Sequence, residues 1–271
     1  MAFLQTDAIS MRFGGIDALD AVSISADPGL VTGLIGPNGA GKTTLFNIIT
    51  GLQPPTAGRV LLDGRDVTGM SVYRRARLGI GRTFQRLEIF GSLSVRDNIR
   101  VTVEVRRRWS RQRIDINKET EAILERVGVA ELAKVPADTL PTGLARLVEL
   151  GRALATRPRL LLLDEPGSGL DATETEAFGK LLAELANDGL AILLVEHDMD
   201  LVMKACSQLS VLDYGELIAS GTPEEIRANR RVQDAYLGSE DLVEDTVAEP
   251  STPSGLAGAG TGTGAGAGEL S

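Results

Sequence analysis

Apolar runs and turn signals along the first quarter of the chain predict a small sheet. Strand-like stretches at residues 8–13, 21–26 and 59–62 are punctuated by Asp-Pro-Gly and Asp-Gly turns, a pattern typical of partly antiparallel strands. Between them, Leu-Val-Thr-Gly-Leu-Ile-Gly at residues 30–36 predicts a short buried strand that leads into a glycine loop. Residues 43–50 have helical spacing, so we expect a strand, a loop and a helix in direct succession.

Two later apolar runs predict the central strands of a parallel sheet. Residues 159–165 (Arg-Leu-Leu-Leu-Leu-Asp-Glu) and 190–197 (Leu-Ala-Ile-Leu-Leu-Val-Glu-His) are of strand length and end in charged residues. Continuous apolar strands suit a parallel sheet that is buried on both faces, with functional groups at the carboxyl ends of the strands.

The middle of the chain has helical spacing and few strand signals. Pro136 and Pro141 interrupt this pattern before a further helical run at residues 144–155. We therefore expect a helical subdomain, at about residues 88–156, inserted into one domain of residues 1–238. Residues 239–271 begin acidic and continue as a Gly/Ala/Thr-rich tract, which predicts a disordered tail because so few apolar side chains cannot offset the entropy of ordering.

Composition narrows the possible functions. The chain has 271 residues, of which 43% are hydrophobic, enough for a sizeable core. The single cysteine, Cys206, excludes an internal disulfide framework and the single histidine, His197, excludes a multi-histidine metal site, which favours the reducing cytosol. Since no apolar run reaches roughly 18 to 20 residues and the first residues lack a signal-peptide pattern, we expect a cytoplasmic protein that does not cross a membrane.

Charge is unevenly distributed along the chain. The formal net charge of −9 argues against nucleic acid as a partner, because phosphate backbones require a basic surface. A local arginine cluster nevertheless stands in the middle of the chain: Arg100, Arg106, Arg107, Arg108, Arg111 and Arg113. This cluster is compatible with anionic lipid headgroups or an acidic loop of a membrane protein, and equally with a solvated helix face.

The glycine loop carries the pattern of a phosphate-binding loop. Gly-Pro-Asn-Gly-Ala-Gly-Lys-Thr-Thr matches glycine, four residues, glycine, lysine and a hydroxyl residue. The glycines allow backbone N–H groups to turn toward phosphates, the following helix adds its positive dipole end, the lysine adds a charge, and the first threonine can bind Mg²⁺. The candidate nucleotide-binding residues are Gly36, Pro37, Asn38, Gly39, Ala40, Gly41, Lys42, Thr43 and Thr44.

The run at 159–165 ends in a pair of carboxylates. Asp164 is a candidate ligand for Mg²⁺, and Glu165 is a candidate base that takes a proton from the attacking water. An acidic strand end alone is more often a turn or a helix cap. Together with the phosphate loop, the pair forms the second half of a nucleotide site.

These motifs, in this order, resemble the ABC ATPase family over nearly all of residues 1–238. The resemblance implies an α/β fold with a P-loop (RecA-like) parallel-sheet core, an antiparallel β subdomain and a helical subdomain. It also implies roles for four more residues: Gln85 in Gly-Arg-Thr-Phe-Gln as a sensor of Mg²⁺ and water, Asp171 as a contact between subunits, His197 at the γ-phosphate, and Phe13 stacked on adenine. Taken singly, Gln85 and Phe13 suit a solvated loop and a core position. Their combination at family spacing favours function.

The signature segment departs from the family pattern. At residues 140–146 the chain has Leu-Pro-Thr-Gly-Leu-Ala-Arg, where the family usually shows Leu-Ser-x-Gly-Gln-Gln-Arg. Pro141 has neither a hydroxyl nor an N–H group to offer the γ-phosphate of the opposite subunit, whereas Gly143 and the following helix N-terminus remain as donors. Each lost charge-assisted hydrogen bond costs roughly 1.5 to 3 kcal/mol, so we expect an asymmetric pair of sites with one slower than the other.

Within the family, three segments resemble the ATPases of branched-chain amino acid importers. They are Phe-Gly-Gly-Ile-Asp-Ala-Leu-Asp-Ala-Val near the start, residues 81–99, and the segment from Tyr214 to the marker Ala-Tyr-Leu-Gly at 235–238. The resemblance implies ATP and Mg²⁺, a second ATPase subunit of a different or the same chain, two membrane-spanning permeases, an indirect solute-binding protein, and a place on the cytoplasmic face of the membrane. Residues 86–113 would then lie where a permease helix docks.

Other functions remain open at this level. ATPases for urea, other amides or other amino acids look much alike, and the solute does not touch this kind of subunit. A soluble nucleotide-gated clamp usually has tandem ATPase domains or a long coiled coil, and neither is predicted here. A catalytically poor regulatory subunit would suit Pro141, whereas a kinase or GTPase would leave the carboxylate pair, Gln85 and His197 unexplained.

Overall fold

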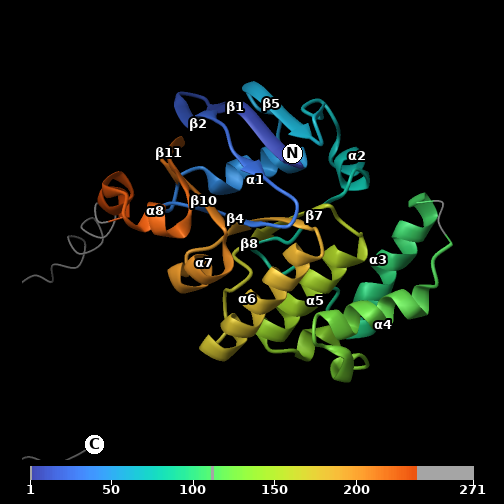
Figure 1. The fold of residues 1–271 in the computed structure, drawn as a ribbon. Coiled ribbons are helices and arrows are strands. Elements are labelled where there is room, and N and C mark those ends of the chain that lie inside the picture. The colour runs from blue at the N-terminus through green and yellow to red at the C-terminus, as the bar shows by residue number, and fades with distance from the viewer. Residues whose placement is uncertain (1, 111–112, 237–271) are drawn as a thin grey trace, which may run out of the picture.

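The computed structural model describes residues 2–110 and 113–236. Two sheets and a group of helices build the protein, and the larger sheet lies between the smaller sheet and the helices (Figure 1). This arrangement confirms the predicted fold class, an α/β core with an antiparallel β subdomain and a helical part. Among the described residues, no helix is long and apolar enough to span a bilayer.

The smaller sheet is antiparallel and has the strand order β2-β1-β5-β6, with β3 also paired to β1. Its strands are β1 (Leu4–Phe13), β2 (Ile16–Val22), β3 (Ser25–Ala26), β5 (Ala57–Leu62) and β6 (Arg65–Asp66). The single strand predicted at 21–26 is wrong, because the chain breaks between β2 and β3. The Thr6 hydroxyl occupies this break, donating to the Val22 carbonyl and accepting from the Ile24 N–H.

The larger sheet has the order β11-β10-β4-β9-β8-β7. Five strands run parallel and only β11 is antiparallel. They are β4 (Val31–Ile35), β7 (Ile80–Arg82), β8 (Leu160–Asp164), β9 (Ala191–Val195), β10 (Gln208–Asp213) and β11 (Glu216–Gly221). All residues of β4, β8 and β9 are buried, as their continuous apolar sequences predict.

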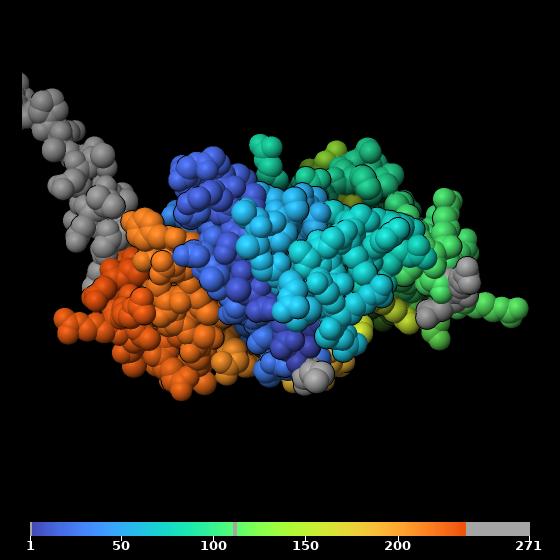
Figure 2. Space-filling view, turned by 90° about the horizontal axis from the view of Figure 1, so that it is seen from above, coloured from blue at the N-terminus to red at the C-terminus, as the bar shows by residue number. Residues whose placement is uncertain are grey.

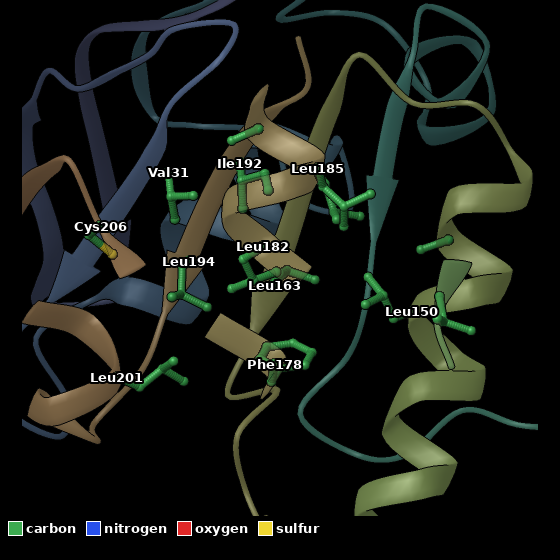
Figure 3. Close-up of a cluster of buried hydrophobic side chains, with 14 of the residues drawn as sticks. Val31, Leu150, Leu163, Phe178, Leu182, Leu185, Ile192, Leu194, Leu201 and Cys206 are labelled. Carbon is green, nitrogen blue, oxygen red and sulfur yellow. The ribbon is translucent and has the colours of Figure 1, made fainter. Parts of the chain in front are cut away.

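Helices cover both faces of this sheet. One face carries α1 (Lys42–Thr50), under the antiparallel sheet, and the other carries α6 (Ala172–Asn187) and α7 (Met199–Ala205) (Figure 1). Figure 3 shows how Phe178 and Leu182 of α6 meet Leu163 and Leu194 in one buried cluster. Shorter helices are α2 (Val72–Arg77), α8 (Pro223–Arg227) and two single 3₁₀ turns, Ala130–Leu132 and Ala137–Thr139.

Three packed helices, α3 (Val95–Ser110), α4 (Ile116–Arg126) and α5 (Thr142–Ala155), lie in the middle of the chain. Their apolar faces join the same core as the large sheet. The helix predicted from residue 144 begins two residues earlier, directly after Pro141, whose fixed φ suits the residue that precedes a helix.

One member of the arginine cluster, Arg106, is buried and does not lie on the surface that the sequence analysis expected. Arg106 is only 3% exposed, because its face of α3 turns inward. It donates to the Ala155 carbonyl at the end of α5 and pairs with Glu119 of α4 at 2.9 Å, so it joins three helices and is not available to a lipid headgroup. Arg100, Arg107, Arg108 and Arg113 are exposed, whereas Arg111 and the tail predicted from residue 239 lie outside the described residues.

Candidate functional site

The candidate residues follow the carboxyl ends of neighbouring parallel strands. The phosphate loop follows β4, Asp164 ends β8, His197 follows β9, and Gln85 follows β7. Since these strands are parallel and adjacent in the order β4-β9-β8-β7, their carboxyl ends share one edge of the sheet. Local sequence patterns therefore predict the functional side chains, and the order of strands in the sheet brings these side chains to one edge.

Glycine is required at two positions of the phosphate loop. Gly36 has a φ of +146°, and a Cβ atom there would lie 2.0 Å from the Leu212 carbonyl oxygen. Gly41, which precedes α1, has a φ of +101°, and its Cβ atom would lie 2.6 Å from the Ala18 carbonyl oxygen. The loop packs this closely against β2 and β10 and delivers the N-terminus of α1 to the site, where unpaired N–H groups favour an anion.

Lys42 is folded back onto the loop. Its ammonium group donates to the carbonyl oxygens of Gly36 and, at 2.9 Å, of Pro37. Burial lowers the pKa of Lys42, while the nearby carboxylates of Glu165 and Asp164 oppose that shift. The lysine therefore lies between the loop and the carboxylate pair, within electrostatic reach of both.

A cavity of about 230 Å³ joins the loop to Gln85 and Glu165. Its lining includes Lys42, Thr43, Gln85 and Glu165. The Gln85 amide nitrogen donates to the Glu165 carboxylate at 3.2 Å, although the two residues are 80 positions apart. Glu165 has a left-handed backbone with φ of 49°, which is uncommon for a side chain with a Cβ atom, and its N–H group donates to the Val195 carbonyl of β9.

Asp164 has a cationic partner that the sequence analysis missed. Arg82 of β7 donates to the Asp164 carboxylate at 3.0 Å and to the Asn47 side chain of α1 at 2.8 Å. Burial raises the pKa of Asp164, and the Arg82 charge opposes that rise. The sequence carried no signal for this pair, because β7 was not predicted as a strand; once β7 is placed beside a buried strand, its arginine requires a partner.

His197 borders a larger cavity on the other side of the loop. This cavity, of about 880 Å³, is lined by residues 36–40, His197 and residues of the C-terminal segment. The His197 side chain is 73% exposed, and its Nδ1 lies 3.9 Å from the buried carboxylate of Glu196. The histidine thus faces space beside the phosphate loop.

Comparison with known proteins decides which family has this arrangement. The family description "ABC transporter" matches residues 19–168, more than half of the chain. The chain belongs to the ABC transporter family. A second family, "Branched-chain amino acid ATP-binding cassette transporter", matches residues 216–241.

Similar proteins place this ABC ATPase among the ATP-binding subunits. It is 38% identical to the high-affinity branched-chain amino acid transport ATP-binding protein BraF of Pseudomonas aeruginosa, with 87% of this chain and 97% of that protein covered. It is also 38% identical to LivG of Escherichia coli (strain K12), which has the same description, at the same coverage. A crystal structure of a nucleotide-free ATP-binding cassette from an ABC transporter is 30% identical, with a TM-score of 0.78 over 87% of this chain and 99% of that one.

The C-terminal segment of this ABC ATPase reaches the phosphate loop. Tyr236, in the marker that the sequence analysis singled out, is half-buried, and its hydroxyl accepts a hydrogen bond from the Gly36 N–H group. Burial raises the pKa of Tyr236, and this hydrogen bond opposes the rise. Leu237 and Gly238, the rest of the marker, lie outside the described part of the chain.

The signature helix of the ABC ATPase holds the segment that carries Gln85. Arg146 of α5 donates to the carbonyl oxygens of Phe84 and Gln85 at 2.8 and 2.6 Å. Glu149, one turn later, pairs with Arg146 and accepts from the N–H groups of Phe84 and Glu88. The sequence analysis did not identify these contacts.

Four predicted residues line neither of these cavities: Asp164, which is buried against Arg82, and Gly143, Asp171 and Phe13. Gly143 lies in the first turn of α5, where a Cβ atom would come within 2.8 Å of Leu170, and it lines a separate cavity of about 430 Å³. Asp171 caps α6 by accepting from the Thr173 and Glu174 N–H groups. Phe13, 47% exposed at the end of β1, pairs with Ile16 across a hairpin.

Proposed function

We propose that this chain hydrolyses Mg-ATP to power the uptake of branched-chain amino acids through an ABC importer. The observation that carries the proposal is the single cavity that unites the phosphate loop with Gln85 and Glu165. The solute follows from what the descriptions of BraF and LivG say of those proteins and from the C-terminal family match.

The side chains divide the chemistry among them. Lys42 and the N–H groups at the start of α1 bind the phosphates, and Glu165 takes a proton from the attacking water while Gln85 orients that water. His197 donates toward the γ-phosphate from the neighbouring cavity. Thr43, Gln85 and Asp164 offer the hydroxyl, amide and carboxylate oxygens that Mg²⁺ prefers, and Mg²⁺ bound there would neutralise charge on the phosphate oxygens.

A second ATPase subunit completes the site. Gly143 and Asp171 do not line either cavity beside their own phosphate loop, so we assign them to the contact with the nucleotide of the partner subunit. Pro141, which precedes α5 without a side-chain cap, weakens that contact. A partner of a different sequence, with an intact signature, would restore one full site. Phe13 of this chain would stack on the adenine of its own ATP.

Permease docking fits an apolar surface beside Gln85. Large apolar side chains are exposed on the segment that follows β7, on α2 and on α3. They are Val72, Tyr73, Phe84, Leu87, Phe90, Val101 and Val105. Arg77 of α2 donates to the Trp109 carbonyl of α3, so these two helices are in contact. Two permeases would bind here and place the chain on the cytoplasmic face of the membrane, with a solute-binding protein acting only through them.

Replacing the proposed base tests the function directly. Glu165→Gln should keep ATP affinity within about twofold of wild type but lower kcat at least about 100-fold, because general-base catalysis contributes at least that factor. The assay uses the complex recovered by co-purification with the tagged full-length chain, and the exposed Glu184→Gln serves as the matched control. Wild-type turnover by Glu165→Gln would refute the assignment, and recovery without hydrophobic subunits would refute the transporter complex.

A further inference from the structure

Glu196 contacts two loops at the edge of the large sheet. It directly follows β9, and one carboxylate oxygen accepts from the Gly167 N–H group at 2.5 Å, 29 positions earlier. The other oxygen accepts from the His197 N–H group at 3.3 Å. A Cβ atom at 167 would lie 2.9 Å from this carboxylate, so a side chain there would displace the end of Glu196.

The carboxylate is buried without a strong cation. Glu196 is 2% exposed, and no lysine or arginine in the described ranges forms an ion pair with it. Burial raises its pKa, and the Gly167 N–H group, the His197 side chain and the N–H groups of His197 and Asp198 oppose that rise. An isolated buried carboxylate is unfavourable, and the hydrogen bond from the Gly167 N–H group is the first of the contacts that offset this cost.

The two loops that meet at Glu196 each carry groups of the proposed reaction. The first starts with Glu165, whose left-handed backbone is followed by Pro166, and it reaches Asp171 at the start of α6. Since proline has no N–H group, Gly167 is the first residue after Glu165 that can be anchored through its amide. The second loop carries His197, adjacent to Glu196.

We propose that Glu196 is a positioning residue, whose carboxylate fixes the loop after Glu165 and the loop of His197 relative to each other. This inference rests on the roles proposed above for Glu165 and His197. It makes the two loops one unit: a displacement of the segment that leads to the partner subunit is transmitted through Gly167 and Glu196 to the histidine. Glu196 itself is not in the cavity lining beside the phosphate loop.

The first test is kinetic and uses Glu196→Gln, which keeps the side-chain shape. The amide retains one acceptor oxygen and presents an NH₂ group to the other backbone donor, so one charge-assisted contact is lost and another weakened. We expect kcat of the copurified complex to fall about tenfold, with KM for ATP within about twofold of wild type. Glu216→Gln, on an exposed glutamate at the start of β11, is the matched control and should leave both constants unchanged.

The second test measures the two loops without relying on activity. Hydrogen exchange of the full-length chain should become faster in peptides that cover 165–171 and 196–201 in Glu196→Gln, while peptides from β1 and α3 remain as in wild type. A simple loss of stability would instead accelerate exchange throughout the core and raise KM. Unchanged exchange in both loops, or an unchanged kcat, overturns the proposal.

Two reference variants separate this inference from the proposed function. If Glu165→Gln and His197→Ala lose activity while Glu196→Gln does not, the positioning role is wrong and the ATPase assignment stands. If Glu165→Gln and His197→Ala hydrolyse ATP like wild type, the assigned roles are wrong and the positioning role falls with them. In the His197→Ala background, Glu196→Gln should lower kcat by clearly less than the roughly tenfold expected in wild type, whereas a full additional loss of about tenfold would show that Glu196 does not couple the two loops and would overturn the proposal.

Discussion

Arg82 and Asp164 illustrate how single residues near the site depend on distant partners. The ion pair joins side chains that are 7% and 3% exposed and 82 positions apart. Arg82 also lies over the Phe84 ring, at 4.9 Å from its centre. The arginine therefore compensates a buried charge, holds the strand end beside α1, and packs on the residue that precedes Gln85.

Removing this cation should destabilise the protein strongly. Arg82→Gln leaves Asp164 buried without its partner, and we expect the free energy of unfolding to fall by about 3 kcal/mol, as for other broken buried pairs. Urea denaturation measures the change. The matched control is Arg59→Gln, which removes the exposed pair with Asp7 and should cost less than about 1 kcal/mol. Equal effects of the two substitutions would show that Arg82 does not stabilise the Asp164 charge.

At the scale of elements, α5 is attached to the segment that carries Gln85. Both the guanidinium of Arg146 and the carboxylate of Glu149 bind main-chain groups of that segment. Since α5 begins at the signature, a movement of the signature is passed to Gln85 by contacts that are largely buried. The contacts between the helix and the segment therefore depend on the charge of Glu149.

The charge of Glu149 gives stability a defined pH dependence. Burial raises its pKa above 4.5, while N–H groups and Arg146 oppose the rise. The folded state therefore binds this proton more readily than the unfolded chain, and the resulting stabilisation, present below pH 4.5, is lost as pH rises through the folded pKa. Relative to Glu149→Gln, wild type should lose free energy of unfolding as pH increases across that range. Urea titrations at several pH values check this, and a constant difference would contradict it.

The C-terminal segment and the phosphate loop form another pair of elements. Tyr236→Phe removes the acceptor of the Gly36 N–H group and should weaken ATP binding about fivefold, equivalent to about 1 kcal/mol, because a hydrogen bond at the start of the loop is lost. Tyr214→Phe is the control, since Tyr214 lines the same cavity but is 85% exposed. Titration with a fluorescent ATP analogue distinguishes the two. Equal affinities would exclude a role of Tyr236 in shaping the loop.

At the scale of the whole molecule, the N-terminal sheet and α2 cover one face between the C-terminal part and the helical part (Figure 2). The arginines of α3 divide between the inside and the outside of this assembly. Arg106 joins α3 to α4 and to the end of α5, whereas Arg107 and Arg108 are exposed. Adjacent arginines of α3 therefore have different roles: Arg106 stabilises helix packing, and Arg107 and Arg108 are available to a partner.

Charge changes on α3 should separate folding from membrane association. Arg107→Glu together with Arg108→Glu should reduce recovery of the complex in the membrane fraction without changing the melting temperature, because both side chains are exposed. Arg106→Ala should instead lower the free energy of unfolding by about 1 to 3 kcal/mol, because it removes the buried hydrogen bond to the Ala155 carbonyl and one of the two arginines that pair with Glu119. Unchanged membrane recovery of the double variant would remove the proposed contact with lipid or an acidic loop.

The sequence by itself determined the pieces that local chemistry specifies. Apolar runs predicted the buried strands at 159–165 and 190–197, and glycine spacing predicted the loop between β4 and α1, because a strand core and a phosphate loop each depend on neighbouring residues. It failed at 21–26, where a side chain 15 or more positions away breaks the strand. It also gave no sign of β7, which has three residues, one of them a glycine, and follows another glycine.

Only the tertiary structure decided which groups meet. Arg82 with Asp164, Arg146 with Gln85, and Glu196 with Gly167 join residues 29 to 82 positions apart. Such pairs are fixed by the order of strands in the sheet and by helix packing, and nothing in the local pattern encodes either. The burial of Arg106 beside exposed neighbours has the same cause, since a helix turns about 100° per residue and its packing partners alone choose the inner face.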